Sequence, residues 1–233
     1  MTAFTDEVVR ICKQELELFG NGKLKEYDKP VYKRVGEYWD ELARDPSYAT
    51  WKGYHGRRQV ELVLNDQDEV VRVKTGADGR PLNKNQPWSA AFISFVAARA
   101  GAGGKFNYGP SHSVYIVKAL KEAAKPNSTA PFIARRRDGY APKVGDLIAC
   151  ERLESADPTF DNYIDFVKNG RYEAHCDYVI GFDAQKQNAI TVGGNVSNSV
   201  KTKKWPLDGQ GRIGRTDPNN ASGGVICIIE NRL

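Results

Sequence analysis

The segment from Asn85 to Gly101, NQPWSAAFISFVAARAG, constrains the fold of this chain more than any other. Pro87 stands where the first turn of a helix tolerates proline, and Gly101 stands just past the last expected turn. Between them nearly every side chain is apolar, so a helix formed here has hardly any polar face. Because a helix that is apolar all round must be buried, the sequence predicts a central helix over residues 87–100.

Three amphipathic helices are predicted around this central one. Residues 5–20 carry apolar side chains at helical spacing, with Thr5 as the expected N-cap. Residues 30–44 show the same spacing, and a third helix is expected to start at Ser111 or Ser113. The N-terminal half of the chain is therefore predicted to be mainly helical.

The chain changes character after Pro131, where short runs rich in β-branched and aromatic residues are typical of strands. Helices followed by strands favour an α+β fold, with a helical half packed on a small antiparallel sheet of about four to six strands. We expect one domain over residues 1–233, made of an N-terminal helical and loop elaboration (1–86) and a catalytic-type core (87–233). The predicted strands are 132–135, 146–150, 175–182, 189–192 and 224–230, with a hairpin around 60–64 and 70–73 and an active-site loop or short helix within 151–173.

The composition and the distribution of charge bear on disorder and on a nucleic-acid partner. The chain is 40% hydrophobic and 27% charged with a formal charge of +5, which is ordinary for a globular protein and argues against disorder. The basic runs 135–137 and 201–204 are not interleaved with aromatic residues, so they are interpreted as solvated faces and no nucleic-acid partner is predicted.

Neither a signal peptide nor a membrane span is predicted. Residues 1–20 lack a basic region followed by an apolar run, and no apolar run has the length needed to cross a bilayer. We therefore expect synthesis in the cytoplasm. The four cysteines show no spacing typical of a zinc site; they are Cys12, Cys150, Cys176 and Cys227. No motif in the sequence implies a metal or an organic cofactor.

Candidate acid–base groups are few because the chain has only three histidines. His175 opens a predicted strand, and the period of two places Asp177 on the same face, where it is a possible orienting group. Asn195 follows the next predicted strand, where its amide can orient His175 or can simply occupy a turn. His112 is a rival base or a substrate contact, whereas His55 is expected to be exposed and inactive.

Ser89 is the candidate nucleophile. It lies between Trp88 and Ala90 in the first turn of the predicted central helix, where unpaired backbone N–H groups can stabilise an anion. The alternative is that Ser89 only caps the helix or lies on the surface.

Four strings in order resemble a known superfamily: PWSAAFISFV, GDLIAC, HCDYVIGFD and ITVGGNVS. Over about residues 87–200 they are similar to the papain-like CHAP and NlpC-type amidohydrolases, which cut bacterial cell-wall peptides. Over roughly residues 5–230 the chain more closely resembles an uncharacterised bacterial and phage domain family in which Pro-Trp-Ser-Ala-Ala-Phe recurs.

The resemblance implies a papain-like fold and hydrolysis of an amide bond in peptidoglycan, by an amidase or a stem-peptide endopeptidase. It implies attack by Ser89, proton transfer by His175 and orientation by Asn195. Trp88, Ala90, His112 and Asp177 would be secondary or substrate contacts. The partners would be peptidoglycan or its stem peptides. A protein of this kind would be a phage lysin or an antibacterial effector, and it would reach the cell wall by phage lysis or by a non-standard export route. An effector would also have an immunity or delivery partner, which the sequence does not identify.

One departure from the superfamily matters, because Ser89 stands where those enzymes carry a cysteine. Three explanations are open: Ser89 is a native nucleophile, the domain is non-catalytic and binds cell wall or a partner, or Ser89 is an engineered replacement of the nucleophile. A serine nucleophile also suits an esterase or another acyl hydrolase.

Overall fold

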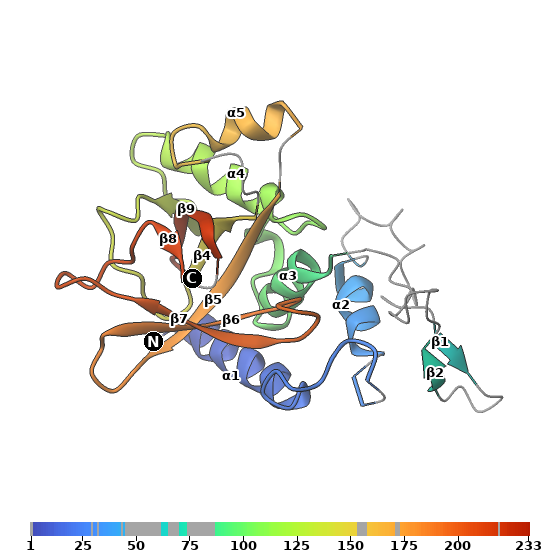
Figure 1. The fold of residues 1–233 in the computed structure, drawn as a ribbon. Helices are drawn as coiled ribbons and strands as arrows, with labels where there is room; N and C mark the ends of the chain where they lie inside the picture. Colours follow the sequence, from blue (N-terminus) through green and yellow to red (C-terminus); the bar gives the residue numbers. More distant parts are fainter. Residues whose placement is uncertain are drawn as a thin grey trace.

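The computed structural model describes residues 2–28, 30–31, 33–42, 44, 62–64, 70–73, 87–152, 158–170, 173–218 and 220–233. His55 lies outside these residues. Figure 1 shows an α+β arrangement in which helices pack against an antiparallel sheet, as the order of the sequence patterns predicts.

The sheet has seven strands, more than the four to six expected. Its order is β3-β9-β4-β5-β6-β7, with β8 paired to β9, and every pairing is antiparallel. The strands β7 (Lys201–Pro206) and β8 (Thr216–Asp217) were not predicted, because neither carries an apolar run. The strands are β3 Phe132–Arg135, β4 Leu147–Glu151, β5 Ala174–Phe182, β6 Asn188–Gly193, β7 Lys201–Pro206, β8 Thr216–Asp217 and β9 Asn220–Asn231, and β1 Leu62–Leu64 and β2 Val70–Val73 form a separate hairpin.

The helices begin close to where their caps predict. The N-cap of the first helix is Thr2, whose hydroxyl accepts a hydrogen bond from the Thr5 backbone at 3.2 Å, so the predicted cap at Thr5 is wrong by one turn. Ser111 does stand at the N-cap of α4, although its side chain makes no capping hydrogen bond. The bounds are α1 Ala3–Leu18, α2 Arg34–Leu42, α3 Ser89–Arg99, α4 His112–Ala123 and α5 Tyr163–Lys168, with a short 3-10 turn at Gly103–Lys105.

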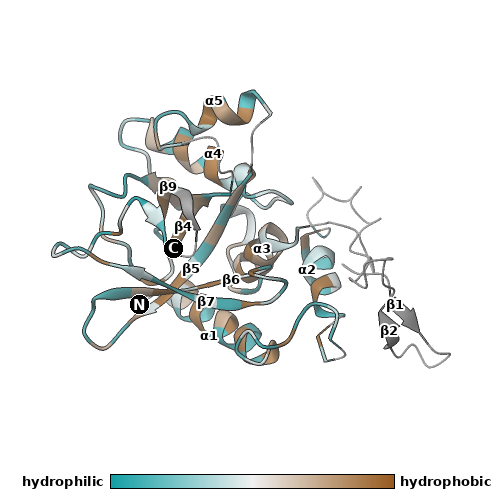
Figure 2. Ribbon diagram, in the orientation of Figure 1, coloured by the Kyte–Doolittle hydropathy of each residue, from teal (hydrophilic) through white to brown (hydrophobic). Residues whose placement is uncertain are grey.

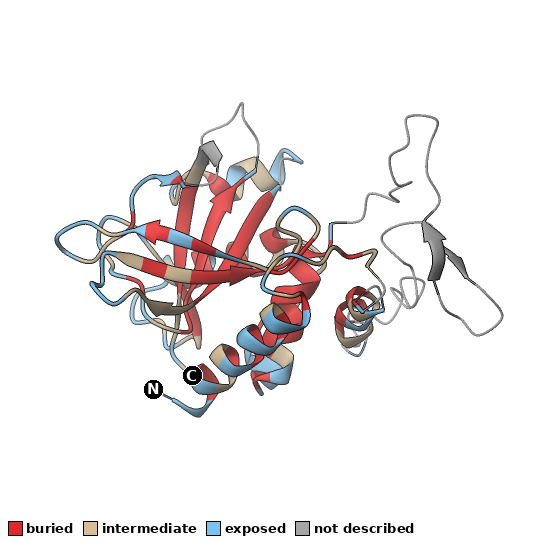
Figure 3. Cartoon of the chain, turned by 60° about the horizontal axis from the view of Figure 1, so that its bottom comes forward, coloured by how far each residue is buried: buried red, intermediate tan, exposed pale blue. Residues whose placement is uncertain are grey.

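The core confirms that the central segment is buried. Every residue of α3 from Ser89 to Ala97 is buried, and the helix contacts α1, α2, β5 and β6. Figure 2 shows the hydrophobic colour running along α3, and Figure 3 shows the buried residues gathered in the strands and in the helices that pack against them. Burying a side chain such as Phe92 contributes about 1.5–3 kcal/mol, so this helix is a main source of stability.

The two faces of the sheet carry separate cores. Along β5, Cys176 and Tyr178 point into the core shared with the helices, whereas Val179 belongs to a second cluster on the opposite face with Trp205 and Ile228. This matches the predicted alternation of the strand that begins near His175. No helix in the described part of the chain combines the length and apolar composition that a bilayer crossing requires.

Candidate active site

Trp88 anchors the start of α3. Its indole is fully buried and stacks on the rings of Phe19 and Tyr38, with centroids 5.8 and 5.6 Å away and interplanar angles of 27° and 29°. It also donates a hydrogen bond to the Glu26 carboxylate. These contacts come from α1, α2 and the loop between them. The N-terminal helices therefore hold the first turn of α3, and with it Ser89, in one place.

Ser89 contacts a histidine, and that histidine is His112. The Ser89 Oγ lies 2.7 Å from His112 Nε2, across 23 residues of sequence, and both side chains are buried. The other ring nitrogen of His112 is hydrogen-bonded to the hydroxyl of Tyr115, one turn further along α4. The structure thus joins Ser89, His112 and Tyr115 in a line from the start of α3 into α4.

These two hydrogen bonds favour the His112 tautomer that can accept a proton from Ser89. The Ser89 hydroxyl can donate to Nε2 only when the His112 proton sits on Nδ1, and the Tyr115 oxygen can accept that proton's hydrogen bond. A tyrosine hydroxyl thereby occupies the orienting position that a carboxylate or amide holds in other Ser/His sites.

His175 belongs to a second, charged line. Its Nε2 lies 2.9 Å from Asp177 Oδ1, and Asp177 Oδ2 lies 3.3 Å from the Lys203 ammonium. Lys203 in turn donates to Asp217 Oδ2 at 2.7 Å, and the Cys150 thiol donates to the same oxygen at 3.3 Å.

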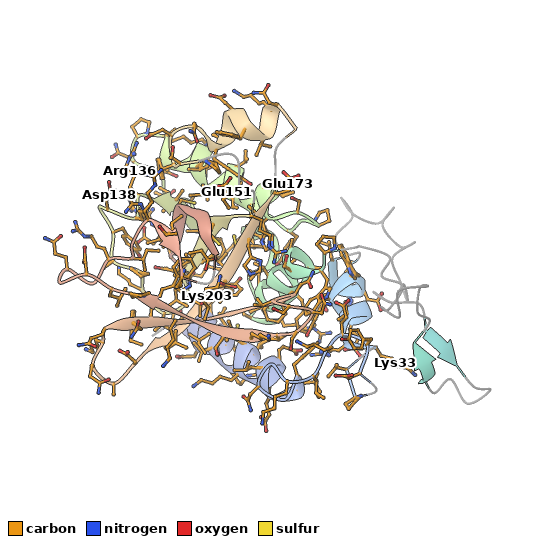
Figure 4. The ribbon with its side chains drawn as sticks, viewed as in Figure 1. Lys33, Arg136, Asp138, Glu151, Glu173 and Lys203 are labelled. Atoms are coloured by element: carbon orange, nitrogen blue, oxygen red, sulfur yellow. The ribbon has the colours of Figure 1, made fainter. Side chains whose placement is uncertain are left out.

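All of these charged groups are buried between β5, β7 and β8. Lys203 is only 7% exposed, so the interpretation of the basic run 201–204 as a solvated face is wrong at this position. Alternation along β7 places Lys203 inward while Lys204 is exposed. Figure 4 shows Lys203 beside the crossing of the long strands.

Arg152 closes the charged line on the other side of His175. Its guanidinium lies 3.0 Å from His175 Nδ1. Because arginine only donates, Nδ1 must accept, and the His175 proton therefore sits on Nε2, facing Asp177. The rings of His112 and His175 meet edge to face with centroids 5.3 Å apart, so the two lines touch at the imidazoles.

Burial and the neighbouring charges keep both imidazoles neutral. Burial lowers the pKa of His112 well below its usual value, and His175 and Arg152 lower it further, against a smaller opposing effect of Asp177. Burial also lowers the pKa of His175, more than Asp177 raises it. For Asp177 itself, burial raises the pKa, but the hydrogen bond with His175 and the Lys203 ammonium outweigh burial and hold this pKa below the usual range. Neutral imidazoles can accept a proton at neutral pH.

Glycines let β6 approach the two histidines. A Cβ at Gly193 would lie 1.8 Å from Asp177 Oδ1 and 3.0 Å from His175 Nε2. A Cβ at Gly194 would lie 2.6 Å from Phe92 on α3. The pair Gly193–Gly194 is therefore required by packing at the site.

Asn195, which follows these glycines, occupies a turn. Its φ is 57°, a left-handed conformation that asparagine tolerates better than most residues. Both ring nitrogens of His175 are engaged by Asp177 and Arg152, and within the described ranges no hydrogen bond joins Asn195 to either histidine. The turn interpretation of Asn195 matches this backbone, and Asp177 is the residue that contacts His175 on its strand.

A cavity of about 220 Å³ opens at Ser89. Its wall brings together the start of α3, the loop before α4 and the adjacent ends of β4 and β5. Ser89, Ala90 and His112 line it together with Arg152 and Glu173. The Ser89 hydroxyl and the imidazole that contacts it thus face a space that can hold a small ligand group.

Sequence reasoning named Ser89, His112, His175 and Asp177 but missed Tyr115, Arg152 and Lys203. A signal existed for Tyr115, because a residue three positions after a histidine lies on the same helix face. Over the part of the chain that the structure describes, no group of three or more His, Cys, Asp or Glu side chains has a metal-binding arrangement.

Comparison with known proteins gives one match. A family model described as "Uncharacterized protein conserved in bacteria (DUF2272)" matches residues 26–223. No curated protein and no solved structure matches the chain.

Proposed function

The chain belongs to the bacterial DUF2272 family, and we propose that it is a serine hydrolase that cleaves an amide bond in peptidoglycan. The observation that carries the proposal is the 2.7 Å contact between Ser89 Oγ and His112 Nε2 beside an open cavity. The resemblance of the four ordered motifs to those of cell-wall amidohydrolases supports the proposed substrate class. A papain-like topology is part of the same proposal and rests on those motifs.

In the proposed reaction, His112 takes the hydroxyl proton while Ser89 Oγ attacks the substrate carbonyl. The oxyanion that forms is placed near the backbone N–H groups of Ser89 and Ala90, which have no acceptor within the first turn of α3. His112 then gives its proton to the leaving amine, and water releases the acyl group by the reverse sequence. Tyr115 keeps the His112 proton on Nδ1 throughout.

His175 has a supporting role in this scheme. It contacts His112 but its own nitrogens are hydrogen-bonded to Asp177 and Arg152. We assign the base to His112 because it is the imidazole that contacts Ser89. His175 as the base, which the sequence resemblance implies, stays an alternative that mutation distinguishes.

The test is digestion of purified peptidoglycan sacculi, read by mass spectrometry of the released fragments. The wild-type protein should release fragments whose masses identify the bond, and Ser89→Ala and His112→Ala should release none. Ser111→Ala is the matched control, because Ser111 lines the same cavity but its hydroxyl is bonded to Ser113. If His175→Ala alone abolishes cleavage and His112→Ala does not, His175 is the base.

Labelling with a fluorophosphonate tests the activated serine without a peptidoglycan substrate. The wild-type protein and Ser111→Ala should be labelled, and Ser89→Ala should not. Fragment release that persists in Ser89→Ala would refute the proposal. Binding to sacculi without cleavage or labelling would instead identify a non-catalytic binding domain, and labelling with cleavage of esters alone would identify an esterase.

A further inference from the structure

The cavity at Ser89 carries one charged side chain of each sign. Arg152 follows the end of β4, and Glu173 immediately precedes β5, so the antiparallel pairing of these strands brings both to the rim. Figure 4 shows Glu173 beside the start of β5. The rest of the wall consists of small residues, prolines and the hydroxyl and imidazole groups of the site.

The guanidinium of Arg152 uses few of its donors on the protein. It makes the 3.0 Å contact with His175 Nδ1, and no carboxylate among the described residues lies within ion-pair distance of it. A guanidinium has five N–H donors in a planar fork that fits a carboxylate through two parallel hydrogen bonds. Donors therefore remain on a cation that lines the cavity next to the nucleophile.

Arg152 is exposed at the rim of the cavity, so its remaining donors face solvent and can exchange water for a ligand. An anion bound in the cavity would pair with this charge without displacing Asp177 from the opposite side of His175.

We propose that Arg152 binds a carboxylate of the substrate, so that the site selects acyl groups that carry a carboxylate close to the scissile carbonyl. This inference rests on the proposed hydrolase function and specifies its substrate class. Glu173 opposes the same carboxylate through its own charge, so the two rim residues affect selectivity in opposite directions. Arg152 is a specificity residue in this scheme, and the base remains His112.

The test compares two 4-nitrophenyl esters of similar shape, the monosuccinate and the butyrate, at pH 8, where both imidazoles are neutral in every variant. Rates are corrected for hydrolysis in buffer, since the succinate carboxylate accelerates the breakdown of its own ester. The wild-type protein should prefer the succinate by about tenfold or more in kcat/KM, as expected for a charge-assisted bidentate pair.

Arg152→Gln should reduce this preference to about one, where the two esters are compared within the same variant because Arg152 also contacts His175 and its loss can change both rates. Arg152→Lys should keep part of the preference, and Glu173→Gln should increase it by roughly threefold, the effect of removing one like charge at a solvated rim. A preference unchanged in Arg152→Gln would overturn the proposal. Since Arg152 and Glu173 are both exposed, far-UV circular dichroism should confirm that the variants fold.

Binding to Ser89→Ala separates this proposal from the proposed function. Calorimetry with succinamate and butyramide should show binding of succinamate alone, lost in Ser89→Ala/Arg152→Gln. Binding of succinamate together with absent ester turnover in the wild-type protein would refute the hydrolase and retain the carboxylate site. Turnover of both esters at equal rates, with equal binding of both amides, would refute the carboxylate site and retain the hydrolase.

Discussion

Replacing the buried Lys203 with methionine should strongly destabilise the protein. The ammonium lies between two carboxylates, 2.7 Å from Asp217 Oδ2 and 3.3 Å from Asp177 Oδ2, in a region where all three side chains are almost inaccessible to water. Methionine has a similar length but no charge, so it removes the cation and leaves the two acidic side chains in the same buried place.

The expected loss is about 3–5 kcal/mol, the usual result of removing one partner from a buried ion pair. In a chain of this length each kcal/mol corresponds to roughly 2–4 °C, so the midpoint of thermal unfolding should fall by about 10 °C. Urea denaturation at pH 7 measures the free energy directly. Lys204→Met is the matched control, since Lys204 is the exposed neighbour on the same strand and should change stability by less than about 0.5 kcal/mol.

Lowering the pH should shrink the penalty of Lys203→Met. In the wild-type protein the lowered pKa of Asp177 contributes stability above the unfolded value near 3.9, and this contribution is lost as the pH falls through the folded pKa. Without Lys203 the folded pKa of Asp177 rises, so protonation of the native state relieves the variant before the wild type. Equal losses in Lys203→Met and Lys204→Met, or a penalty that grows toward pH 4, would refute the buried-pair reasoning.

Three further predictions concern the two histidines. Gly193→Ala should lower the free energy of unfolding by about 1–3 kcal/mol and abolish activity, because the added Cβ would overlap Asp177. The control is Gly181→Ala, whose Cβ would meet no atom within 4 Å, and it should change neither stability nor activity. Equal unfolding curves for the two variants would contradict the close packing at Gly193. Tyr115→Phe should lower kcat about threefold to tenfold, the value of one hydrogen bond, with KM unchanged, as steady-state kinetics would show. The acid limb of kcat/KM should lie below pH 6.5, because burial lowers the pKa of His112 and the base stays neutral as the pH falls through that value; a limb at or above 6.5 would contradict the assignment.

The elements that the sequence predicts well are those whose own residues decide their burial. The buried helix α3 follows from an apolar segment bounded by Pro87 and Gly101, and β3 coincides with its predicted range 132–135. In contrast β7, KTKKWP, carries alternating polar residues and contains a lysine at a buried position. That lysine can be buried because it forms ion pairs with Asp177 and Asp217, which lie on two other strands. The residues around Lys203 in the sequence give no sign of these partners.

The sequence predicts several residues of the candidate site, but it does not predict which of them contact one another. Ser89 and His112 lie on two different helices, and their contact depends on how the loop before α4 returns to α3. That return is set by reciprocal hydrogen bonds at 3.2 Å between the Ser94 hydroxyl and the backbone of Gly109, and by the closeness of Gly109 to Val114, where a Cβ would lie 2.6 Å away. A glycine and a buried serine carry no recognisable signal of such a turn, so sequence reasoning favoured the more familiar histidine at the start of a strand.

The charges around the two imidazoles are compatible with neutral histidines and with the proposed proton transfer from Ser89 to His112. Among the described residues, Arg152 and Asp177 contact His175, and Lys203 and Asp217 continue this line of charges beyond Asp177. These four charges sum to zero when both imidazoles are neutral, and Glu173 adds a negative charge at the exposed rim. In the proposed reaction His112 takes the proton of Ser89, so the imidazolium and the oxyanion form together and the net charge of the site is unchanged. At a separation of about 4 Å and an effective dielectric of about 20, their attraction is on the order of 4 kcal/mol. A free imidazolium gains no such attraction, so the same burial that lowers the pKa of His112 favours its protonation only while the oxyanion is present.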